Sequence, residues 1–304
     1  MDRLFTLFRQ HFGRDHKYVR PLTGSASNRQ YFRLSDDETS CVGVLGVNPD
    51  ENRTFIAMAA HFRAQGIAVP EVYAVSEDAV AYIQEDLGDT ALFGIVGSEG
   101  SEELLCRTVR CLPDIQFKGA DGFDFSVCHS VCRFDRRLVL FDLNYFKYCF
   151  LKPSGLEFDE NRLQDDFERL ADDLTSVKTD TFMYRDFNAR NVMIKDGAPC
   201  FIDFQGGMQG PIYYDVASFV WHARAGYSQD LKMRMLDEYL DALSVYISVD
   251  REAFLETLRL FVLFRTMQIL GAYGFRGMVE QKATFVVSIP DAVGSLASQL
   301  ETHL

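Results

Sequence analysis

The sequence lacks an excess of basic residues, with 31 lysines and arginines against 44 aspartates and glutamates and a formal net charge of −13. Proteins that bind nucleic acids use Lys and Arg to neutralise phosphates, so this class of partner is disfavoured. The sequence also lacks an apolar run long enough to span a membrane. Its first 12 residues lack the apolar stretch and small-residue cleavage site of a signal peptide. We expect no nucleic-acid and no membrane partner.

The sequence also lacks cysteines at the spacing that is typical of disulfide-rich or zinc-binding proteins. No two cysteines have CxxC spacing, and their odd number disfavours a disulfide framework. Cys128, His129 and Cys132 lie close together, but no second pair of ligands lies nearby to complete a zinc site. We expect reduced thiols and a cytoplasmic location. The seven cysteines are Cys41, Cys106, Cys111, Cys128, Cys132, Cys149 and Cys200.

The first part of the chain predicts a small, mostly antiparallel sheet. A length of 304 residues with 47% hydrophobic residues suits one large or two modest domains. Short β-type runs bounded by turn residues indicate strands, and apolar residues at helical spacing indicate helices. The expected strands are 19–22, 30–34, 41–47, 72–75 and 79–84, with helices at 4–12 and 51–65. The run 85–89 breaks the pattern and predicts a hinge, so we expect an N-terminal lobe at 1–86.

The rest of the chain predicts a larger, mainly helical lobe at 87–304. Helical spacing recurs at 101–112, 134–150, 161–175, 215–223, 231–245, 251–270 and 283–300. The glycine-rich run 271–277 predicts a loop. Three short strands interrupt the helices, at 182–184, 191–194 and 200–202.

Three polar side chains around these short strands carry the chemical signal. Asp186 and Asn191 sit at the two ends of one loop, and Asp203 lies twelve residues beyond Asn191, after the next strand. A turn at Asp196-Gly197 joins the strands into a hairpin. We therefore expect all three side chains to converge at one end of it.

Phosphoryl transfer to an alcohol needs this combination of groups. One carboxylate positions the attacking hydroxyl and accepts its proton, while an amide oxygen and a second carboxylate hold magnesium against nucleotide phosphates. D-x-x-x-x-N followed by an apolar strand and I-D-F has the spacing of kinase catalytic and metal loops. The alternative is a polar loop whose Asp and Asn side chains cap turns.

The segment 182–221 resembles the aminoglycoside phosphotransferase and choline kinase family. That family carries H-x-D-x-x-x-x-N, then I-D-F, then G-x-x-x-x-D, and here the last element is Gly210 to Asp215. Tyr-Arg-Asp-Phe, Ile-Asp-Phe-Gln and Gly-Pro before Tyr-Asp are most similar to the bacterial kinases that phosphorylate N-acetylmuramate or N-acetylglucosamine at the anomeric hydroxyl. The run 25–34 also resembles the nucleotide loop of that group.

The resemblance implies an α+β, bilobal protein-kinase-like fold that uses ATP and Mg²⁺. Asp186 would be the catalytic base, Asn191 and Asp203 the magnesium ligands, and Asp215 a structural brace. The residues assigned to ATP are Ser25, Ser27 and Asn28 over the phosphates, and the backbone around Gln84, Glu85 and Asp86 at the adenine. The favoured acceptor is an N-acetylated amino sugar, and the alternatives are an aminoglycoside, choline, homoserine or methylthioribose. We expect a monomer or weak homo-oligomer.

Two departures from the family pattern raise questions. Tyr184 stands where much of the family has His, a position that supports the loop, and Tyr can pack and hydrogen-bond there. The strand 41–47 has no Lys or Arg, although protein kinases place a phosphate-binding lysine on their third strand. Either an arginine substitutes, with Arg29, Arg33 and Arg53 nearest and Arg33 assigned here, or magnesium and backbone amides suffice, or the chain is a nucleotide-binding pseudokinase.

Further polar residues extend the predicted site. Arg190, beside the base, is assigned to stabilising the transferring phosphoryl group, although it and Arg185 have an alternative role in pairing with Asp203 or Asp215. Asp142, within an aromatic run that is typical of a core, either binds acceptor hydroxyls or is solvated. The helical pair Arg265 and Gln268 shares one face and is a further candidate for the acceptor.

Overall fold

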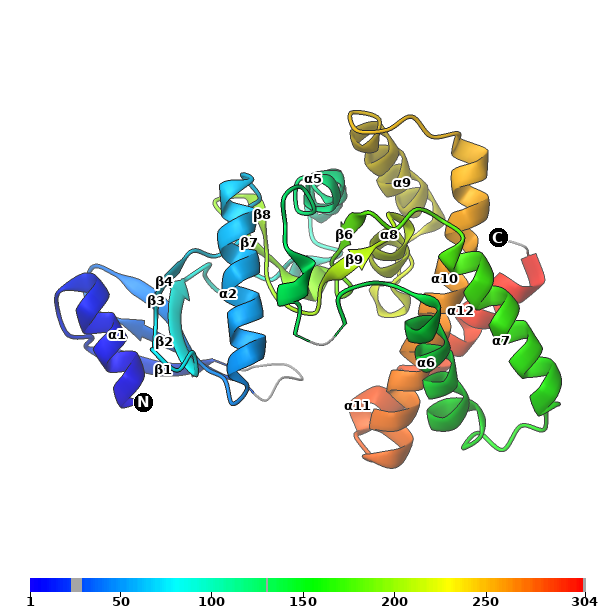
Figure 1. Cartoon of the computed structure of the whole chain (residues 1–304), viewed down its shortest axis with the longest axis horizontal. Coiled ribbons are helices and arrows are strands. Elements are labelled where there is room, and N and C mark those ends of the chain that lie inside the picture. Colours follow the sequence, from blue (N-terminus) through cyan, green and yellow to red (C-terminus); the bar gives the residue numbers. More distant parts are fainter. Residues whose placement is uncertain (23–28, 130, 303–304) are drawn as a thin grey trace.

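The chain folds into two lobes of unequal size (Figure 1). The computed structural model describes residues 1–22, 29–129 and 131–302. A five-stranded antiparallel sheet lies at one end, and helices fill the other end. The predicted α+β, bilobal arrangement is therefore confirmed. A division at residues 86 and 87 stays a prediction.

The N-terminal lobe is built on a sheet of order β1-β2-β3-β5-β4. Alternate side chains point to its two faces. One face packs Leu34 and Ile83 against Leu4 of α1, and the other contributes Val44 and Tyr82 to the main core. Its elements are α1 (Asp2–Phe12), β1 (Tyr18–Leu22), β2 (Gln30–Ser35), β3 (Ser40–Leu45), α2 (Pro49–Ala64), β4 (Val72–Val75) and β5 (Ala81–Glu85).

Helix α2 connects this sheet to the rest of the molecule. Asn48 caps its first turn by accepting from the backbone of Asp50 and Glu51, and Pro49 occupies the first turn, where its missing N–H is not needed. Its buried face carries two phenylalanines, Phe55 and Phe62, whose rings lie 4.8 and 5.2 Å from that of Phe204. Figure 1 shows α2 standing between the sheet and the β7–β8 hairpin.

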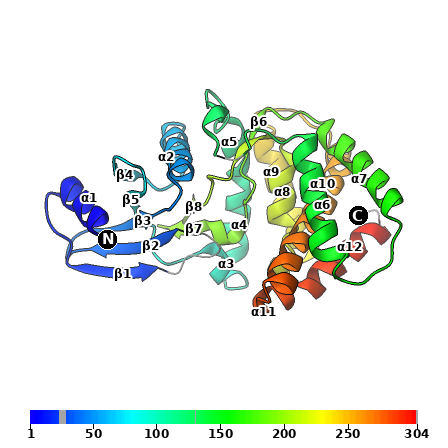
Figure 2. The same cartoon turned by 60° about the horizontal axis from the view of Figure 1, so that its bottom comes forward.

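The C-terminal lobe is a helical assembly around the long helix α10, which contacts α6, α8 and α12. Figure 2 shows these helices gathered at the end opposite the sheet, with α4 and the β7–β8 hairpin between. Its α-helices are α3 (Leu92–Ile95), α4 (Ser101–Arg110), α5 (Leu112–Phe117), α6 (Arg136–Phe146), α7 (Glu160–Thr175), α8 (Tyr213–Val220), α9 (Gln229–Leu243), α10 (Arg251–Tyr273), α11 (Ala283–Val286) and α12 (Ile289–Thr302).

Two small strand pairs place the predicted catalytic loop. β6 (Thr181–Met183) pairs with β9 (Met208–Gly210), and β7 (Val192–Lys195) pairs with β8 (Ala198–Phe201), both antiparallel. Asp196, with φ of 51°, and Gly197, with φ of 73°, make the turn of the second pair. The segment 184–191 lies between β6 and β7, and 202–207 lies between β8 and β9. Both segments therefore meet at the same end of the hairpin.

The predicted loop at 271–277 is wrong. Helix α10 runs to Tyr273, and a π-helical turn continues to Val279. An added Cβ at Gly274 would lie 2.2 Å from the carbonyl oxygen of Cys149, so this glycine permits close helix packing rather than a turn. The expected helix 283–300 is likewise divided, between α11 and α12. None of the helices in the described ranges has both the length and the apolar character needed to cross a bilayer.

Candidate active site

A cleft of about 1120 Å³ brings the predicted catalytic residues together. One wall comes from the sheet and α2, with Val42, Glu51 and Tyr82 among its residues. The opposite wall includes Asp186, Asn191 and Asp203. The convergence expected of these three side chains is therefore present, although their chemical roles stay predictions.

Short-range polar contacts fix the shape of the loop from Asp186 to Asn191. Asn188 caps its 3₁₀ turn by accepting from the backbone N–H of Arg190 at 3.0 Å. The Asn191 Nδ2 donates to the Asp186 carbonyl at 2.9 Å. Because Nδ2 is used in this bond, the Oδ1 of Asn191 is the atom left to accept or to bind a cation.

Asp215 holds the beginning of the same loop. Its two carboxylate oxygens accept from the backbone N–H groups of Tyr184, at 2.7 Å, and Arg185, at 2.9 Å. Arg185 has a φ of 74°, a left-handed conformation that needs such support. Burial raises the pKa of Asp215 to about 7, and the two N–H donors oppose that shift. These contacts match the structural role expected for Asp215.

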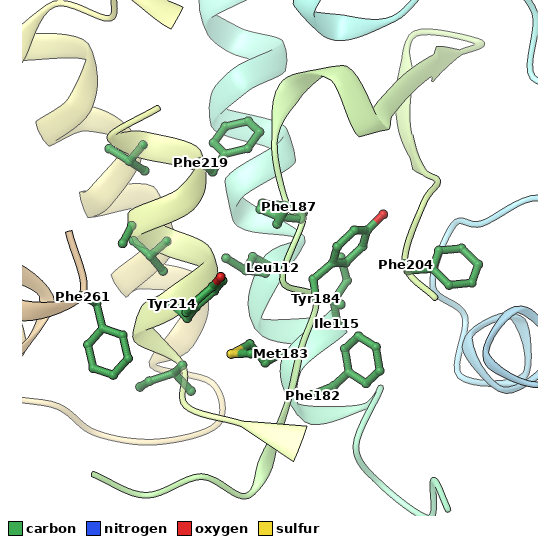
Figure 3. Close-up of a cluster of buried hydrophobic side chains, with 14 of the residues drawn as sticks. Leu112, Ile115, Phe182, Met183, Tyr184, Phe187, Phe204, Tyr214, Phe219 and Phe261 are labelled. Atoms are coloured by element: carbon green, nitrogen blue, oxygen red, sulfur yellow. The ribbon is translucent and has the colours of Figure 1, made fainter. Parts of the chain in front are cut away.

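Tyr184 links the catalytic loop to the metal loop. Its ring is fully buried, and its hydroxyl donates to the backbone carbonyl of Ile202, directly before Asp203. Figure 3 shows this hydroxyl directed toward the segment that carries Phe204, on the side away from Phe219. Tyr184 thus packs and hydrogen-bonds at this position, as the sequence predicted.

We predict that Tyr184→Phe destabilises the fold by about 1 kcal/mol, because the Ile202 carbonyl loses its donor. A fall in kcat should accompany this loss, since the two loops are no longer tied. Urea denaturation and steady-state kinetics measure both effects. Tyr148→Phe is the control, since Tyr148 is 57% exposed and accepts or donates no described side-chain hydrogen bond. Equal stability of the two variants would contradict the role of Tyr184.

Oxygen donors suited to magnesium gather around Asp203. Gln205 donates from Nε2 to the Asp203 Oδ1 at 2.8 Å, and its own Oε1 is buried without a hydrogen-bond partner in the described ranges. Asn191 adds its Oδ1 to the same cleft. A carboxylate and neutral oxygens are the ligands that Mg²⁺ prefers, usually completed by phosphates and water. The predicted ligands Asn191 and Asp203 therefore fit this ion, and Gln205 is a residue that the site prediction did not include.

The zinc alternative finds no support. No group of three His, Cys, Asp or Glu side chains that could hold a metal occurs in the parts of the chain described. Cys128 is buried and His129 contacts Asn48, while the described cysteines are all unpaired thiols.

The environment of Asp186 favours its use as a base. Its carboxylate is open to the cleft, yet the surrounding protein raises its pKa, while the nearby cations Arg265, Arg185 and Arg190 oppose that shift. Arg190 lines the cleft, with its guanidinium 5.7 Å from the centre of the Phe93 ring. No ion pair of Arg185 or Arg190 with a carboxylate is found among the described residues, so the alternative pairing with Asp203 or Asp215 is not observed.

A polar network joins α6, α8 and α10. Gln268 donates to the Asp142 Oδ2 at 2.6 Å and accepts from the Tyr214 hydroxyl at 2.7 Å. Arg265 donates to that hydroxyl at 2.9 Å. Asp142 is 6% exposed, so it is not solvated. Burial raises the pKa of the Asp142 carboxyl, and the positive charges of Arg185 and Arg265 oppose that rise. The same two arginines also oppose the rise in the pKa of the Asp186 carboxylate, and neither Asp142 nor Gln268 is among the residues that line the cleft.

The residues predicted to meet adenine line the same cleft. Gln84, Glu85 and Asp86 all belong to its wall. The Glu85 side chain is held by Lys195, and the Asp86 side chain by Arg33 and Ser40. The side chains of these two residues are therefore held by other partners, and the contact of their backbone with adenine stays a prediction. Ser25, Ser27 and Asn28, predicted at the phosphates, lie outside the described residues.

The assignment of Arg33 to ATP stays a prediction, although the structure places this side chain at the hinge. Its guanidinium binds the Asp86 carboxylate in a fork, at 2.6 and 2.8 Å, and also contacts Asp89, so it braces the hinge instead of lining the cleft. Arg29 lines the cleft, and its side chain is 3% exposed and lies 3.0 Å from the Glu51 carboxylate. Arg29 and Arg33 both lie shortly after the run 23–28, and the local sequence does not show which of them lines the cleft.

Comparisons with known proteins agree with this geometry. A sequence profile described as the phosphotransferase enzyme family matches residues 19–255. An N-acetylmuramate/N-acetylglucosamine kinase of Neisseria meningitidis serogroup B is 26% identical over 226 residues, which cover 70% of this chain and 64% of that kinase. The chain thus spans less than two thirds of the length of this curated relative.

Solved structures share the fold at low identity. A choline kinase from Cryptosporidium parvum superimposes with a TM-score of 0.68 at 10% identity, covering 99% of this chain and 94% of that one. A spectinomycin phosphotransferase in complex with ADP and spectinomycin gives a TM-score of 0.64 at 13% identity, with coverages of 99% and 98%. These likenesses concern the fold alone, and they confirm the predicted protein-kinase-like class.

Proposed function

We propose that this chain, which belongs to the phosphotransferase enzyme family, transfers the γ-phosphoryl group of ATP to the anomeric hydroxyl of an N-acetylated amino sugar. The single observation that carries the proposal is the meeting of Asp186, Asn191 and Asp203 in one cleft. Fixed groups in such a cleft act mainly by positioning and by neutralising charge, which is what phosphoryl transfer requires.

Each wall of the cleft has a separate task in this proposal. The backbone around Gln84 to Asp86 meets the adenine, and Asp203 and Asn191 hold Mg²⁺, which supplies positive charge to the phosphates. Asp186 orients the acceptor hydroxyl and takes its proton. Arg190, with no carboxylate partner among the described residues, faces the transferring group. Use of ATP is supported by the ADP complex of the spectinomycin phosphotransferase that shares this fold.

An amino sugar as acceptor is supported by the name of the Neisseria relative and by the polar network of α6, α8 and α10. Asp142 and Gln268 offer an acceptor and an amide at that place, which suit sugar hydroxyls and an N-acetyl group. Arg185 and Arg265 add positive charge near Asp186.

A panel of acceptors tests the proposal. The panel contains N-acetylglucosamine, N-acetylmuramate, choline, an aminoglycoside, homoserine and methylthioribose, each with Mg-ATP. We expect transfer to the N-acetylated sugars, with ³¹P NMR placing the ester at the anomeric carbon through coupling to its proton. An ester on another hydroxyl, or transfer to a cationic acceptor alone, would contradict the assignment. ATP binding without any transfer would favour a pseudokinase.

We predict that Asp142→Asn raises the KM for the sugar about 10- to 100-fold, because a hydrogen bond to a charged group is lost in a buried site. The KM for ATP should stay within a factor of two or so, since Asp142 lies away from the adenine wall. Steady-state kinetics with each substrate varied separates the two values. Asp172→Asn, an exposed residue of α7 that pairs with Arg136, is the control. A parallel rise of both KM values would show general damage instead.

A further inference from the structure

The third strand of the sheet carries no lysine or arginine that could bind nucleotide phosphates. Resting on the proposed use of ATP, we propose that Arg29 binds the phosphates of the nucleotide and that Glu51 holds it for this role. Arg29 comes directly before β2, and its side chain lies on the cleft wall beside the first turn of α2. This pair would act as a Lys–Glu pair acts in protein kinases, with the cation coming from a different strand.

Strand β3 carries no charged side chain where protein kinases have their phosphate-binding lysine. Val42 and Val44 of β3 face the cleft and α2, and Val42 lies opposite Gln84 of β5 in the sheet. Val42 lines the cleft, so an apolar group stands on the third strand where a kinase presents its lysine. A polyphosphate in this cleft therefore needs its cation from another element.

Three cations line the cleft within the described residues: Arg20, Arg29 and Arg190. Arg20 is 60% exposed and turned to the Asp89 carboxylate at the outer edge. Arg190 belongs to the catalytic loop, on the opposite wall. Arg29 is the buried cation on the wall formed by the sheet. The α- and β-phosphates of the nucleotide would pass along this wall with the adenine at Gln84 and the metal at Asp203.

Helix α2 ties Arg29 to the metal loop. Glu51 and Phe55 are four residues apart and thus share one face of the helix. Glu51 binds the Arg29 guanidinium at 3.0 Å, and that guanidinium lies 5.9 Å from the centre of the Phe55 ring. The Phe55 ring stacks on Phe204, with centroids 4.8 Å apart, and Phe204 directly follows Asp203. One helical face therefore supports Arg29, which would contact the phosphates, and the loop whose Asp203 would hold the magnesium.

Tyr31 supports this proximity. Burial raises the pKa of its hydroxyl, which the positive charge of Arg29 lowers and the negative charge of Asp203 raises. Tyr31 also lines the cleft. Both charges thus act on one side chain of the cleft wall.

A series of adenine compounds distinguishes phosphate binding from a purely structural ion pair. Calorimetry measures the affinities of adenosine, AMP, ADP and Mg-ATP for the unchanged chain, Arg29→Gln, Arg29→Lys, Glu51→Gln and Arg53→Gln. We expect Arg29→Gln to weaken ADP and ATP about 10- to 100-fold and to leave adenosine unchanged. Glu51→Gln should weaken the binding of ADP and ATP by a smaller factor and should also leave the affinity for adenosine unchanged. Arg53, 57% exposed on α2 and paired with Asp50, is the matched control and should have no effect.

The outcomes separate this proposal from the one on which it rests. Unchanged ADP and ATP affinities in Arg29→Gln, or an equal loss for adenosine and ATP, would overturn the role of Arg29. If Arg29→Gln does not fold, Arg29→Lys decides, because it keeps the charge and should retain part of the preference for ADP over adenosine. A chain that binds no adenine compound at all would instead overturn the use of ATP.

Discussion

Asp186→Asn should lower kcat by about 10²- to 10⁴-fold, the range expected for loss of a general base. Asn keeps the size of the side chain but accepts no proton at neutral pH. The loop should keep its shape, because the described bonds of Asn188 and Asn191 go to the Asp186 backbone carbonyl and not to its carboxylate. Single-turnover kinetics would therefore show slow chemistry with normal ATP affinity.

Asp196→Asn is the matched control for this variant. Asp196 lies on the adjacent hairpin turn, is exposed and is also an aspartate, but it does not line the cleft. Its variant should keep full activity. Turnover of Asp186→Asn within a factor of ten or so of the unchanged chain would refute the assigned base, while loss of its ATP affinity would indicate collapse of the loop.

Asp203→Asn should abolish the dependence of nucleotide binding on magnesium, weakening Mg-ATP by at least about 10- to 100-fold. Asp203 has a φ of 67°, a left-handed conformation that Asn adopts at little cost and Ala does not. The substitution thus removes the charge with little added backbone strain. It also keeps an oxygen for the bond from Gln205.

The measurement is an ATP titration with and without Mg²⁺. In the unchanged chain the metal should tighten binding, and in Asp203→Asn the two curves should coincide. Asp196→Asn is again the control, since Asp196 has a φ of 51° and so carries the same backbone requirement. A magnesium effect of normal size in Asp203→Asn would show that the ion is held elsewhere.

The parts of the site that depend on neighbouring residues could be predicted from the sequence. Asp186, Asn191 and Asp203 are separated by one loop and one hairpin, and the Asp196-Gly197 turn supplies the left-handed residues that close that hairpin. Local turn chemistry therefore determines where these side chains meet. The hydrogen bond from Tyr184 spans the same hairpin and could be anticipated for the same reason.

The parts that depend on distant contacts could not be predicted. Arg29 and Arg33 differ in the structure because one meets Glu51 on α2 and the other meets Asp86 at the hinge, 53 residues along the chain. Gly274 reads as a turn residue, although its missing side chain accommodates the Cys149 backbone of another helical segment. Asp142 is likewise buried, and its hydrogen-bond partner Gln268 lies on α10, 126 residues further along the chain. Sequence spacing contains no information about such pairings.

A crystal structure of the chain with Mn²⁺ and a non-hydrolysable ATP analogue would test the central claim most directly. We predict an anomalous peak for the metal between the Asn191 Oδ1 and the Asp203 carboxylate, with the Asp186 carboxylate facing the γ-phosphate and not bound to the ion. A metal bound away from these two side chains, or a nucleotide outside the cleft, would contradict the account.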